Sequence, residues 1–305
     1  MHDVIIIGAG PAGYTAGIYC ARARHDTLLI SGILPGGQLM NTTDVENYPG
    51  FSDGIMGPDL MAVMRKQTEK MGTKIIDDEV TSVDFKNRPL KVKTASEEFE
   101  ARAVIVCTGA NPRKIGLEGE QTFAGKGVSY CATCDGAFFR DQELIVVGGG
   151  DSAMEEAIFL TKFASVVHIV HRKEEFRASK IMQERALSNE KIKVHFNSTV
   201  KEIHGDQKFQ QVVLNNTKTN EDKILEAGGL FIAIGHEPNS AIFQDQIELD
   251  RNGYMIIKNN TETSVTGVFC AGDVHDHRYR QAVTAAGFGC MAAIDVDKYL
   301  SESNT

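Results

Sequence analysis

Two stretches of the chain repeat one pattern of hydrophobic and polar positions. Each begins with a short run of consecutive apolar residues, at 4–7 and at 144–147, that leads directly into a glycine-rich turn. Uninterrupted apolar runs of this length are typical of parallel strands buried on both faces of a sheet. Helix-compatible stretches follow at 12–23 and 153–163, and further short apolar strands at 27–30 and 165–170. The pattern therefore predicts two strand–helix–strand units of an α/β protein.

The turn between strand and helix has the same glycine spacing in both units. Residues 8–13 read GAGPAG, which fits GxGxxG, and residues 148–153 read GGGDSA, in which alanine takes the third place. The first glycine permits a tight turn, the second lets the backbone approach a pyrophosphate, and the third position packs helix against strand. The N–H groups that open the following helix attract phosphate. Both turns therefore predict dinucleotide binding; the alternative is a tight turn without a ligand.

The two units differ after their second strand, where the ribose of a dinucleotide is held. Folds that bind NAD or FAD usually place an acidic residue there. After the second unit the chain instead carries a histidine and three cations: His171, Arg172, Lys173 and Arg177. Positive charge at this point favours the 2′-phosphate of NADPH. The alternative is a solvated basic turn, because Glu174 and Glu175 dilute the charge.

The first unit has no acidic residue at the corresponding position, which is Ser31. A flexible turn at 36–39 can instead lie along a cofactor. A further apolar run at 268–270 ends in Ala-Gly and Asp273. Because ligands of open α/β sheets bind at the carboxyl ends of the strands, Asp273 is a candidate acceptor for the ribitol hydroxyls of a cofactor. The alternative for Asp273 is a helix N-cap.

Two more apolar runs mark where the chain passes between domains. Residues 104–112 and 230–238 resemble each other, since both leave a buried strand through a glycine and end in proline. We therefore expect one domain from residues 1–112 and 240–305, with a second domain, 113–239, inserted into it. A helical apolar pattern at 287–300 completes the first domain. The expected fold class is α/β, with two dinucleotide-binding domains.

The net charge and the positions of the cysteines limit the classes of function expected for this chain. The 305-residue chain has 41 acidic and 32 basic residues and a formal net charge of −9, so neither nucleic acid nor an anionic membrane is expected as its main partner. It has no run of 18 apolar residues and no signal-peptide pattern, so we expect a cytoplasmic protein. Cysteines are normally reduced in that compartment. Four of them stand singly in surroundings typical of core residues: Cys20, Cys107, Cys270 and Cys290.

The remaining two cysteines, Cys131 and Cys134, form a CxxC pair. A structural zinc site needs about four ligands, and the other candidates are His168 and His171. The two further interpretations are a pair of packed, unreactive thiols and a redox-active dithiol. Two dinucleotide sites in the same chain favour the dithiol, because they can supply its electrons. At the start of a helix or turn, backbone N–H groups lower a thiol pKa, so that one sulfur can attack a substrate disulfide and the other can resolve the mixed disulfide.

Asp135 directly follows the pair. A partly buried carboxyl group can be tuned toward neutral pH and can carry the protons that accompany thiol chemistry. The alternative is an ordinary turn aspartate before Gly136. A nicotinamide transfers hydride, and a flavin passes those two electrons on to a disulfide. We therefore expect the first domain to bind FAD and the second to bind NADPH, with electrons leaving through Cys131 and Cys134 to an external disulfide.

Several short motifs are together similar to those of one known family. They are GAGPAG at 8–13, GGQL at 36–39, VEN at 45–47, CATCD at 131–135, GGG at 148–150, HRxxxxR at 171–177, AGD at 271–273 and RQA at 280–282. On these motifs the chain resembles the low-molecular-weight thioredoxin reductases, which are pyridine nucleotide-disulfide oxidoreductases, along essentially its whole length. The CATCD motif just before the second glycine turn is highly specific.

The resemblance implies a homodimeric enzyme with two Rossmann-like domains, the NADPH domain inserted into the FAD domain, that reduces the disulfide of thioredoxin. It also implies that the inserted domain rotates between the half-reactions, with the hinge near residues 110 and 237. By the same resemblance, Cys134 lies nearer the flavin, Cys131 attacks thioredoxin and Asp135 is the acid/base. Arg172 and Arg177 hold the 2′-phosphate.

The candidate cofactor-binding residues follow from the glycine turns and from the resemblance. For FAD they are Gly8, Gly10, Pro11, Ala12, Gly13, Gly37, Gln38, Asn47, Gly272, Asp273, Arg280, Gln281 and Ala282. For NADPH they are Gly148, Gly150, Asp151, Ser152, Ala153, His171, Arg172, Lys173 and Arg177. No metal is expected.

One residue departs from the family pattern. The family usually has a second consecutive arginine where this chain has Lys173, which offers a point charge in place of a planar fork and weakens the expected preference for NADPH over NADH. Two alternatives to the thioredoxin reductase remain. One is a flavin disulfide reductase that serves a glutaredoxin-like or peroxiredoxin-reducing partner, and the other is a non-catalytic nucleotide sensor with a zinc-bound CxxC.

Overall fold

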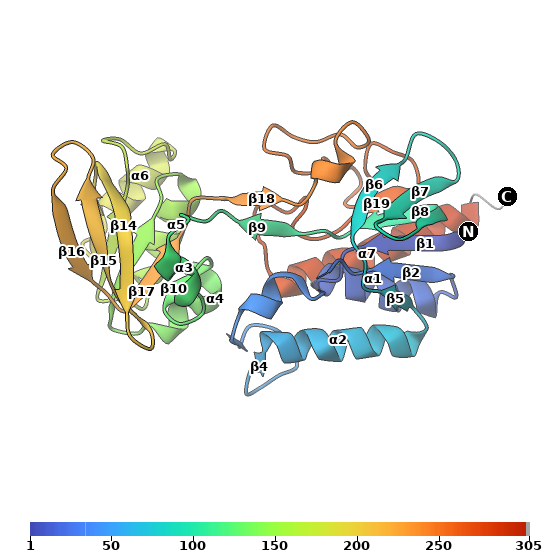
Figure 1. Cartoon of the computed structure of the whole chain (residues 1–305), viewed down its shortest axis with the longest axis horizontal. Helices are drawn as coiled ribbons and strands as arrows, with labels where there is room; N and C mark the ends of the chain where they lie inside the picture. Colours follow the sequence, from blue (N-terminus) through green and yellow to red (C-terminus); the bar gives the residue numbers. More distant parts are fainter. Residues whose placement is uncertain (34, 303–305) are drawn as a thin grey trace. The chain divides into compact units, whose positions relative to one another are not determined.

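The chain forms two compact units. The structure is a computed structural model that describes residues 1–33 and 35–302. One unit comprises Met1–Asn111 and Glu237–Thr305, and the other comprises Pro112–His236. The second unit is therefore continuous in sequence and is inserted into the first, as the colours along the chain show (Figure 1).

A largely parallel sheet forms the centre of the first unit. Its path is β5-β2-β1-β8-β7-β6, and β19 pairs with β8. The parallel strands are β1 (His2–Ile7), β2 (Thr27–Ile30), β5 (Lys74–Ile76), β8 (Glu98–Val106) and β19 (Val268–Cys270). In the register, Ile6 is paired with Leu29 of β2 and with Ile105 of β8, and all three side chains are fully buried. This central position explains why β1 is apolar at consecutive residues.

Helices and short antiparallel strands complete the first unit. Helix α1 (Pro11–Arg22) begins directly after the first glycine turn and packs beside the C-terminal helix α7 (Ala282–Glu302), in the same hydrophobic core (Figure 1). Helix α2 (Gly57–Met71) ends at Gly72, whose φ of 110° requires glycine. The other elements are η1 (Gly37–Asn41), β3 (Asp44–Val45), β4 (Ile55–Met56), η3 (Ala241–Phe243), and the antiparallel strands β6 (Val80–Asp84) and β7 (Leu90–Thr94).

The second unit has its own parallel sheet, in the order β10-β17-β11-β12-β13. Its strands are β10 (Val128–Ser129), β11 (Glu143–Val147), β12 (Val166–Val170), β13 (Ile192–His195) and β17 (Gly229–Ile232). The helices are α3 (Glu118–Thr122), α4 (Ala132–Asp135), η2 (Gly136–Phe138), α5 (Asp151–Leu160) and α6 (Lys180–Leu187). An antiparallel meander of β14 (Ser198–Gly205), β15 (Phe209–Asn216) and β16 (Asp222–Glu226) lies between β13 and β17 in sequence.

Two short strands connect the units. They are β9 (Ala110–Pro112) and β18 (His236–Pro238), which pair with each other (Figure 1). The glycine just before each strand has a left-handed backbone, with φ of 69° at Gly109 and 105° at Gly235. Both chain crossings therefore combine a glycine, a short extended segment and a proline.

The structure confirms both predicted strand–helix–strand units. The helices expected at 12–23 and 153–163 are α1 and α5, and the strands expected at 27–30 and 165–170 are β2 and β12. The apolar runs at 104–112 and 230–238 begin within β8 and β17 and end with β9 and β18, and the run at 268–270 is β19. The helix expected at 287–300 is longer, since α7 already begins at Ala282. The meander β14–β16 was not predicted, because its alternating pattern is interrupted by register shifts near Val200 and His204.

A row of ionisable side chains crosses the sheet of the second unit. His168 Nε2 lies 2.8 Å from Glu143 Oε2, and His168 Nδ1 lies 2.9 Å from His195 Nε2. With Glu143 ionised, His168 donates through Nε2 and accepts at Nδ1 the N–H of His195. Burial is the main cause that lowers the pKa of His195 to about 4, and the neighbouring His168, Lys223 and Lys193 add to the shift. The folded protein therefore keeps His195 neutral in weak acid.

Acid is expected to destabilise the protein partly through His195. In the unfolded chain a histidine takes up a proton near its ordinary pKa of about 6.5, so unfolding binds a proton and stability falls as the pH drops from there toward the folded-state value. His195→Asn keeps a donor for His168 but cannot titrate. We expect this variant to lose less melting temperature than the wild type between about pH 7 and about pH 5, measured by circular dichroism.

His204→Asn is the matched control, because His204 is an exposed histidine paired with Glu202 on the meander. This control should show the same acid-dependent fall in melting temperature as the wild type. An unchanged fall in the His195→Asn variant would show that His195 does not contribute to the pH dependence.

Candidate functional site

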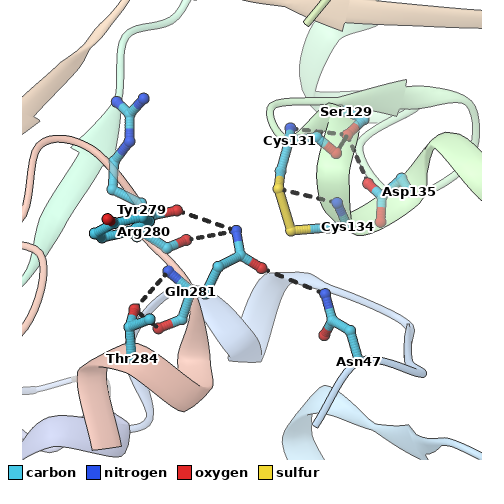
Figure 2. Close-up of a disulfide and its surroundings, with 9 residues drawn as sticks. All are labelled: Asn47, Ser129, Cys131, Cys134, Asp135, Tyr279, Arg280, Gln281 and Thr284. Carbon is cyan, nitrogen blue, oxygen red and sulfur yellow. Dashed lines mark hydrogen bonds between the residues drawn. A yellow bond between two sulfur atoms is a disulfide. The ribbon is translucent and has the colours of Figure 1, made fainter. Parts of the chain in front are cut away.

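Cys131 and Cys134 form a disulfide in the second unit (Figure 2). Their Cα atoms are 5.3 Å apart. Cys131 is the N-cap of α4, and its Sγ accepts a hydrogen bond from the N–H of Cys134 at 3.2 Å. Cys131 is half-buried and Cys134 is exposed. The two intervening residues thus close the pair within one helical turn, as the CxxC spacing predicts.

A compact hydrogen-bond network holds Asp135 behind the disulfide (Figure 2). Ser129, at the end of β10, donates its hydroxyl to Asp135 Oδ2 at 2.5 Å and accepts the N–H of Cys131 at 3.1 Å. Burial raises the pKa of Asp135, and the hydrogen bond from Ser129 acts in the opposite direction. A carboxyl group with a raised pKa beside a disulfide is suited to exchange protons with the sulfurs.

The first glycine turn lets β1, α1 and the end of β8 approach closely. Gly8 has a φ of 107°, and a Cβ there would lie 2.3 Å from the carbonyl oxygen of Cys107. A Cβ on Gly13 would lie 1.9 Å from the carbonyl oxygen of Gly8. A Cβ on Gly10 would meet no atom of the described residues within 4 Å. Pro11 follows at the first helical position, where its missing N–H costs no hydrogen bond. The open side of Gly10 and the N-terminus of α1 therefore suit a phosphate group.

The second glycine turn makes corresponding close contacts. A Cβ on Gly148 would lie 2.5 Å from the carbonyl oxygen of Ala233 and 2.6 Å from Cβ of Ala153, which takes the place of Gly13. Gly150, the N-cap of α5, again has open space where a Cβ would stand, within the described part of the chain. Ser152 is half-buried in the first turn of α5.

The start of α5 is tied to the basic stretch 171–177 and the loop that follows it. Asp151 accepts the N–H and the hydroxyl of Ser179 at 2.8 and 2.7 Å, and these hydrogen bonds lower its pKa. The N–H of Arg177 donates to the carbonyl of Gly149 at 2.8 Å. His171 is buried against Gly149, where a Cβ would lie 2.2 Å from the imidazole ring. The structure therefore places His171 beneath the turn, as a support for it.

The three cations of this stretch, unlike the buried His171, lie at the surface. The side chains of Arg172, Lys173 and Arg177 are exposed. Glu174, one of the two acids that dilute the basic charge in the sequence, is paired with Lys218. The cations beside the second glycine turn are thus accessible to an anionic group.

The loop after β19 brings Asp273 close to the first glycine turn. Gly272 packs against Ala12, since a Cβ on Gly272 would lie 3.1 Å from Cβ of Ala12. Burial and then the negative charge of Asp276 raise the pKa of Asp273 to about 7, while Arg280 opposes the shift. Helix α7 begins only at Ala282, so Asp273 is not its N-cap.

His275, in the same loop, carries a buried Nε2 that has no hydrogen-bond partner among residues 1–33 and 35–302. Burial lowers the pKa of His275 to about 4, so the ring is neutral. A buried carboxyl group with a raised pKa and a neutral imidazole form a polar, weakly charged surface. Hydroxyl groups such as those of a ribityl chain can bond to both.

The other predicted contacts of the first unit lie around this loop. Asn47 Nδ2 donates to Gln281 Oε1 at 3.3 Å, and Gln281 Nε2 donates to the carbonyl of Arg280 at 3.0 Å (Figure 2). A Cβ on Gly37 would lie 3.7 Å from Cα of Gly10. Gln38 donates to Asn111 Oδ1 at 2.7 Å. The structure therefore brings these segments of the first unit, far apart in sequence, to the edge where α1 begins.

Three features of these sites were missed in the sequence. Ser129 precedes the CxxC motif and carries no signal other than its hydroxyl. Buried Glu120 accepts the N–H groups of Ile115 and Gly116 and the hydroxyl of Tyr130, next to Cys131. Ser31 donates to Asp77, which also forms two hydrogen bonds with Arg65. A carboxylate thus does stand beside the end of β2, but it comes from the end of the neighbouring strand β5.

The described residues contain neither a cluster of three or more His, Cys, Asp and Glu side chains arranged to hold a metal ion nor a helix suited to crossing a membrane. His168, a candidate zinc ligand in the sequence, uses both ring nitrogens in hydrogen bonds to Glu143 and His195.

Comparison with known proteins agrees with this geometry. The family model described as "Pyridine nucleotide-disulphide oxidoreductase" matches residues 2–289. A thioredoxin reductase from Streptomyces clavuligerus is 54% identical over 99% of this chain and 94% of its own length.

Solved structures give the same result. The thioredoxin reductase from Giardia duodenalis is 42% identical and superposes with a TM-score of 0.95 over 98% of this chain and 99% of its own. The thioredoxin reductase of Lactococcus lactis, described as being in the FR conformation, is 43% identical, with a TM-score of 0.67 over 99% of this chain and all of its own. The chain therefore belongs to the pyridine nucleotide-disulphide oxidoreductase family, among its thioredoxin reductases.

Proposed function

We propose that this enzyme uses NADPH to reduce the disulfide of thioredoxin, passing two electrons through FAD and the Cys131/Cys134 pair. The observation that carries the proposal is the disulfide of α4, in which Cys134 is exposed, with the half-buried Asp135 connected to it through Ser129. A redox disulfide needs a source of electrons, and two glycine turns that suit dinucleotides can provide it. Similar proteins named thioredoxin reductase support the same reaction.

We assign FAD to the domain formed by residues 1–112 and 240–305. The open side of Gly10 at the start of α1 fits the pyrophosphate. Asp273 and the unpartnered His275 Nε2, within the described residues, fit hydroxyl groups of the ribityl chain. Asn47 and Gln281 provide further amide groups nearby. Bound there, the flavin would accept hydride from the nicotinamide and reduce the disulfide.

We assign NADPH to the inserted domain, residues 113–239. Gly150 and the start of α5 would hold its pyrophosphate. The exposed guanidinium groups of Arg172 and Arg177 would bind the 2′-phosphate, and Lys173 would add a point charge. His171 contributes indirectly, because its buried ring shapes the turn that holds the pyrophosphate.

The residues of the second unit account for the thiol chemistry. Two electrons break the Cys131–Cys134 bond, and two protons complete the thiols. Asp135 would give a proton to the sulfur released as thiolate. Cys131 then attacks the thioredoxin disulfide, and one thioredoxin thiolate leaves and is protonated. Cys134 attacks Cys131 in turn, which restores the enzyme disulfide and releases the second thioredoxin thiol.

A rotation between the units would serve the two half-reactions. The relatives from Giardia and Lactococcus have nearly equal identity to this chain, but their TM-scores are 0.95 and 0.67. Such a difference at equal identity supports two arrangements of the same parts among these relatives. In this chain, β9 and β18, each preceded by a left-handed glycine, would be the hinge.

We further propose a homodimer located in the cytoplasm. Neighbouring helices α1 and α7 expose apolar side chains, which a second copy of the chain would cover: Tyr19, Val283, Met291 and Ile294. Cys20, Cys107, Cys270 and Cys290 are free thiols, as is usual in a reducing compartment.

The electron route predicts a spectroscopic result. The purified protein should be yellow, anaerobic NADPH should bleach it, and oxidised thioredoxin should restore the colour. In Cys134→Ser, thioredoxin reduction should fall to background while NADPH still bleaches the flavin, because the dithiol acts only after the flavin. Cys290→Ser, at a half-buried free cysteine, is the control and should keep its turnover. Normal thioredoxin reduction by Cys134→Ser, or a colourless protein that takes up no FAD, would rule out the route.

The basic stretch predicts the nucleotide preference. Arg172→Ala or Arg177→Ala would remove a charge-assisted hydrogen bond of about 1.5–3 kcal/mol, which raises the KM for NADPH by about 10- to 150-fold. The KM for NADH should stay unchanged, because NADH has no 2′-phosphate. Lys173→Arg should increase the preference for NADPH. Lys201→Ala is the control, because it also removes one positive charge but lies on the meander. It should leave the KM values for NADPH and NADH unchanged. Equal effects of the arginine variants on NADPH and NADH would contradict the assignment.

A further inference from the structure

Ser129 is the centre of the hydrogen bonds around the disulfide (Figure 2). Its Oγ accepts the N–H of Cys131 at 3.1 Å and lies 2.5 Å from Asp135 Oδ2 and 3.4 Å from the carbonyl oxygen of Cys131. The residue is 5% exposed. The single hydroxyl proton thus has two acceptors within reach, one on the carboxyl group and one on the backbone of the redox pair.

The protonation state of Asp135 decides which acceptor the hydroxyl uses. When the carboxylate is ionised, it can only accept, so Ser129 donates to Asp135 Oδ2. When the carboxyl group is protonated, its O–H donates to Ser129 Oγ, and the serine proton turns to the carbonyl of Cys131. The Cys131 N–H keeps the serine in place in both states. Ser129 Oγ and Asp135 Oδ2 therefore keep a hydrogen bond to each other in both protonation states without movement of the backbone.

We propose that Ser129 is a positioning residue that ties the carboxyl group of Asp135 to the backbone of Cys131 and reverses its hydrogen bond when Asp135 gains or loses a proton. This role deepens the proposed function and rests on it. The proton balance is simple, since Asp135 loses one proton to a cysteine thiolate, which becomes a thiol, and regains one from solvent. Ser129 keeps one proton throughout and only changes its acceptor.

The reversal removes an energetic obstacle to proton exchange. A partly buried carboxyl group that loses its hydrogen-bond partner in one protonation state would be left unsatisfied, which is unfavourable. A fixed donor such as an N–H group would satisfy the ionised form alone. A hydroxyl group donates and accepts, so it satisfies both forms.

Other ionisable groups lie on the surrounding elements and are left in place by substitutions at Ser129. Helix α5, which packs against α4, carries Asp151, Glu155 and Glu156. Tyr130 is hydrogen-bonded to Glu120. A change in the titration of Asp135 in a Ser129 variant can therefore be attributed to the lost hydroxyl.

The experiment compares Ser129→Ala, Ser129→Thr and the wild type in two measurements on the FAD-loaded enzyme. The first is the pH dependence of kcat and KM with thioredoxin. The second is an infrared titration of the protonated carboxyl band, assigned by its loss in Asp135→Asn. Ser240→Ala is the control, because Ser240 is equally buried and donates to a backbone carbonyl, that of Gly253.

Loss of the hydroxyl should stabilise the protonated form of Asp135. In Ser129→Ala the carboxyl band and the pH profile of kcat should shift together to higher pH, because the bond from Ser129 favours the ionised carboxylate. We expect kcat to fall about 10- to 100-fold, and the KM for thioredoxin and bleaching by NADPH to be unchanged. Ser129→Thr, which keeps the hydroxyl, should restore both titrations, and Ser240→Ala should match the wild type.

Each contrary result has a distinct meaning. If the Ser129→Ala titrations stay at wild-type pH, or if Ser129→Thr fails to restore them, the inference is overturned and Ser129 is a packing residue. If the wild type bleaches with NADPH but does not reduce thioredoxin, the proposed function fails and this role fails with it. The infrared titration does not depend on turnover, so a loss of activity by misfolding is separated from a change at Asp135.

Discussion

Both proposed nucleotide sites depend on the missing side chains of Gly8 and Gly148. A Cβ at either position would overlap the carbonyl oxygen of the neighbouring strand segment, that of Cys107 at 2.3 Å or of Ala233 at 2.5 Å. These two carbonyls lie just before the connecting strands β9 and β18. The close contact at each glycine therefore leaves the following helix N-terminus open to phosphate. It also holds the backbone just before the segment that connects the two units. A substitution at either glycine would disturb binding and connection together.

The sequence was sufficient to predict those parts of the structure that follow from a local pattern of residues. Strands β1 and β11 are buried on both faces, so their apolar runs have no polar alternation and could be recognised without a partner strand. The turns after them could be recognised from their glycine spacing, although the backbone atoms that exclude a side chain at Gly8 and Gly148 belong to Cys107 and Ala233, far along the chain. The CxxC pair likewise closes inside one helical turn, which is why its spacing predicted the bond that the structure contains.

Where the outcome depends on distant partners, the sequence was not sufficient. His171 stands among cations in the sequence, yet its ring is buried against Gly149 and only its neighbours are exposed. Ser31 has no acidic neighbour along the chain, because its carboxylate partner, Asp77, follows another strand. The role of Ser129 requires the chain to turn between β10 and α4 so that its hydroxyl reaches Asp135, and no sequence motif marks that contact. These cases share one cause, which is that tertiary packing assigns the partner of a polar group.

The two carboxyl groups with raised pKa values differ in what surrounds them, and this difference separates their chemistry. Burial and the negative charge of Asp276 raise the pKa of Asp273 to about 7, while Arg280 opposes the shift. The shift comes from burial and from charged neighbours, and such a carboxyl group can form hydrogen bonds with the hydroxyl groups of a ligand. Burial raises the pKa of Asp135, and the hydrogen bond from the Ser129 hydroxyl lowers it. This hydroxyl group can change from donor to acceptor. A reversible partner suits a group that must change state in every cycle, which is the role we propose for Asp135, whereas the role we propose for Asp273 is to bind a ligand.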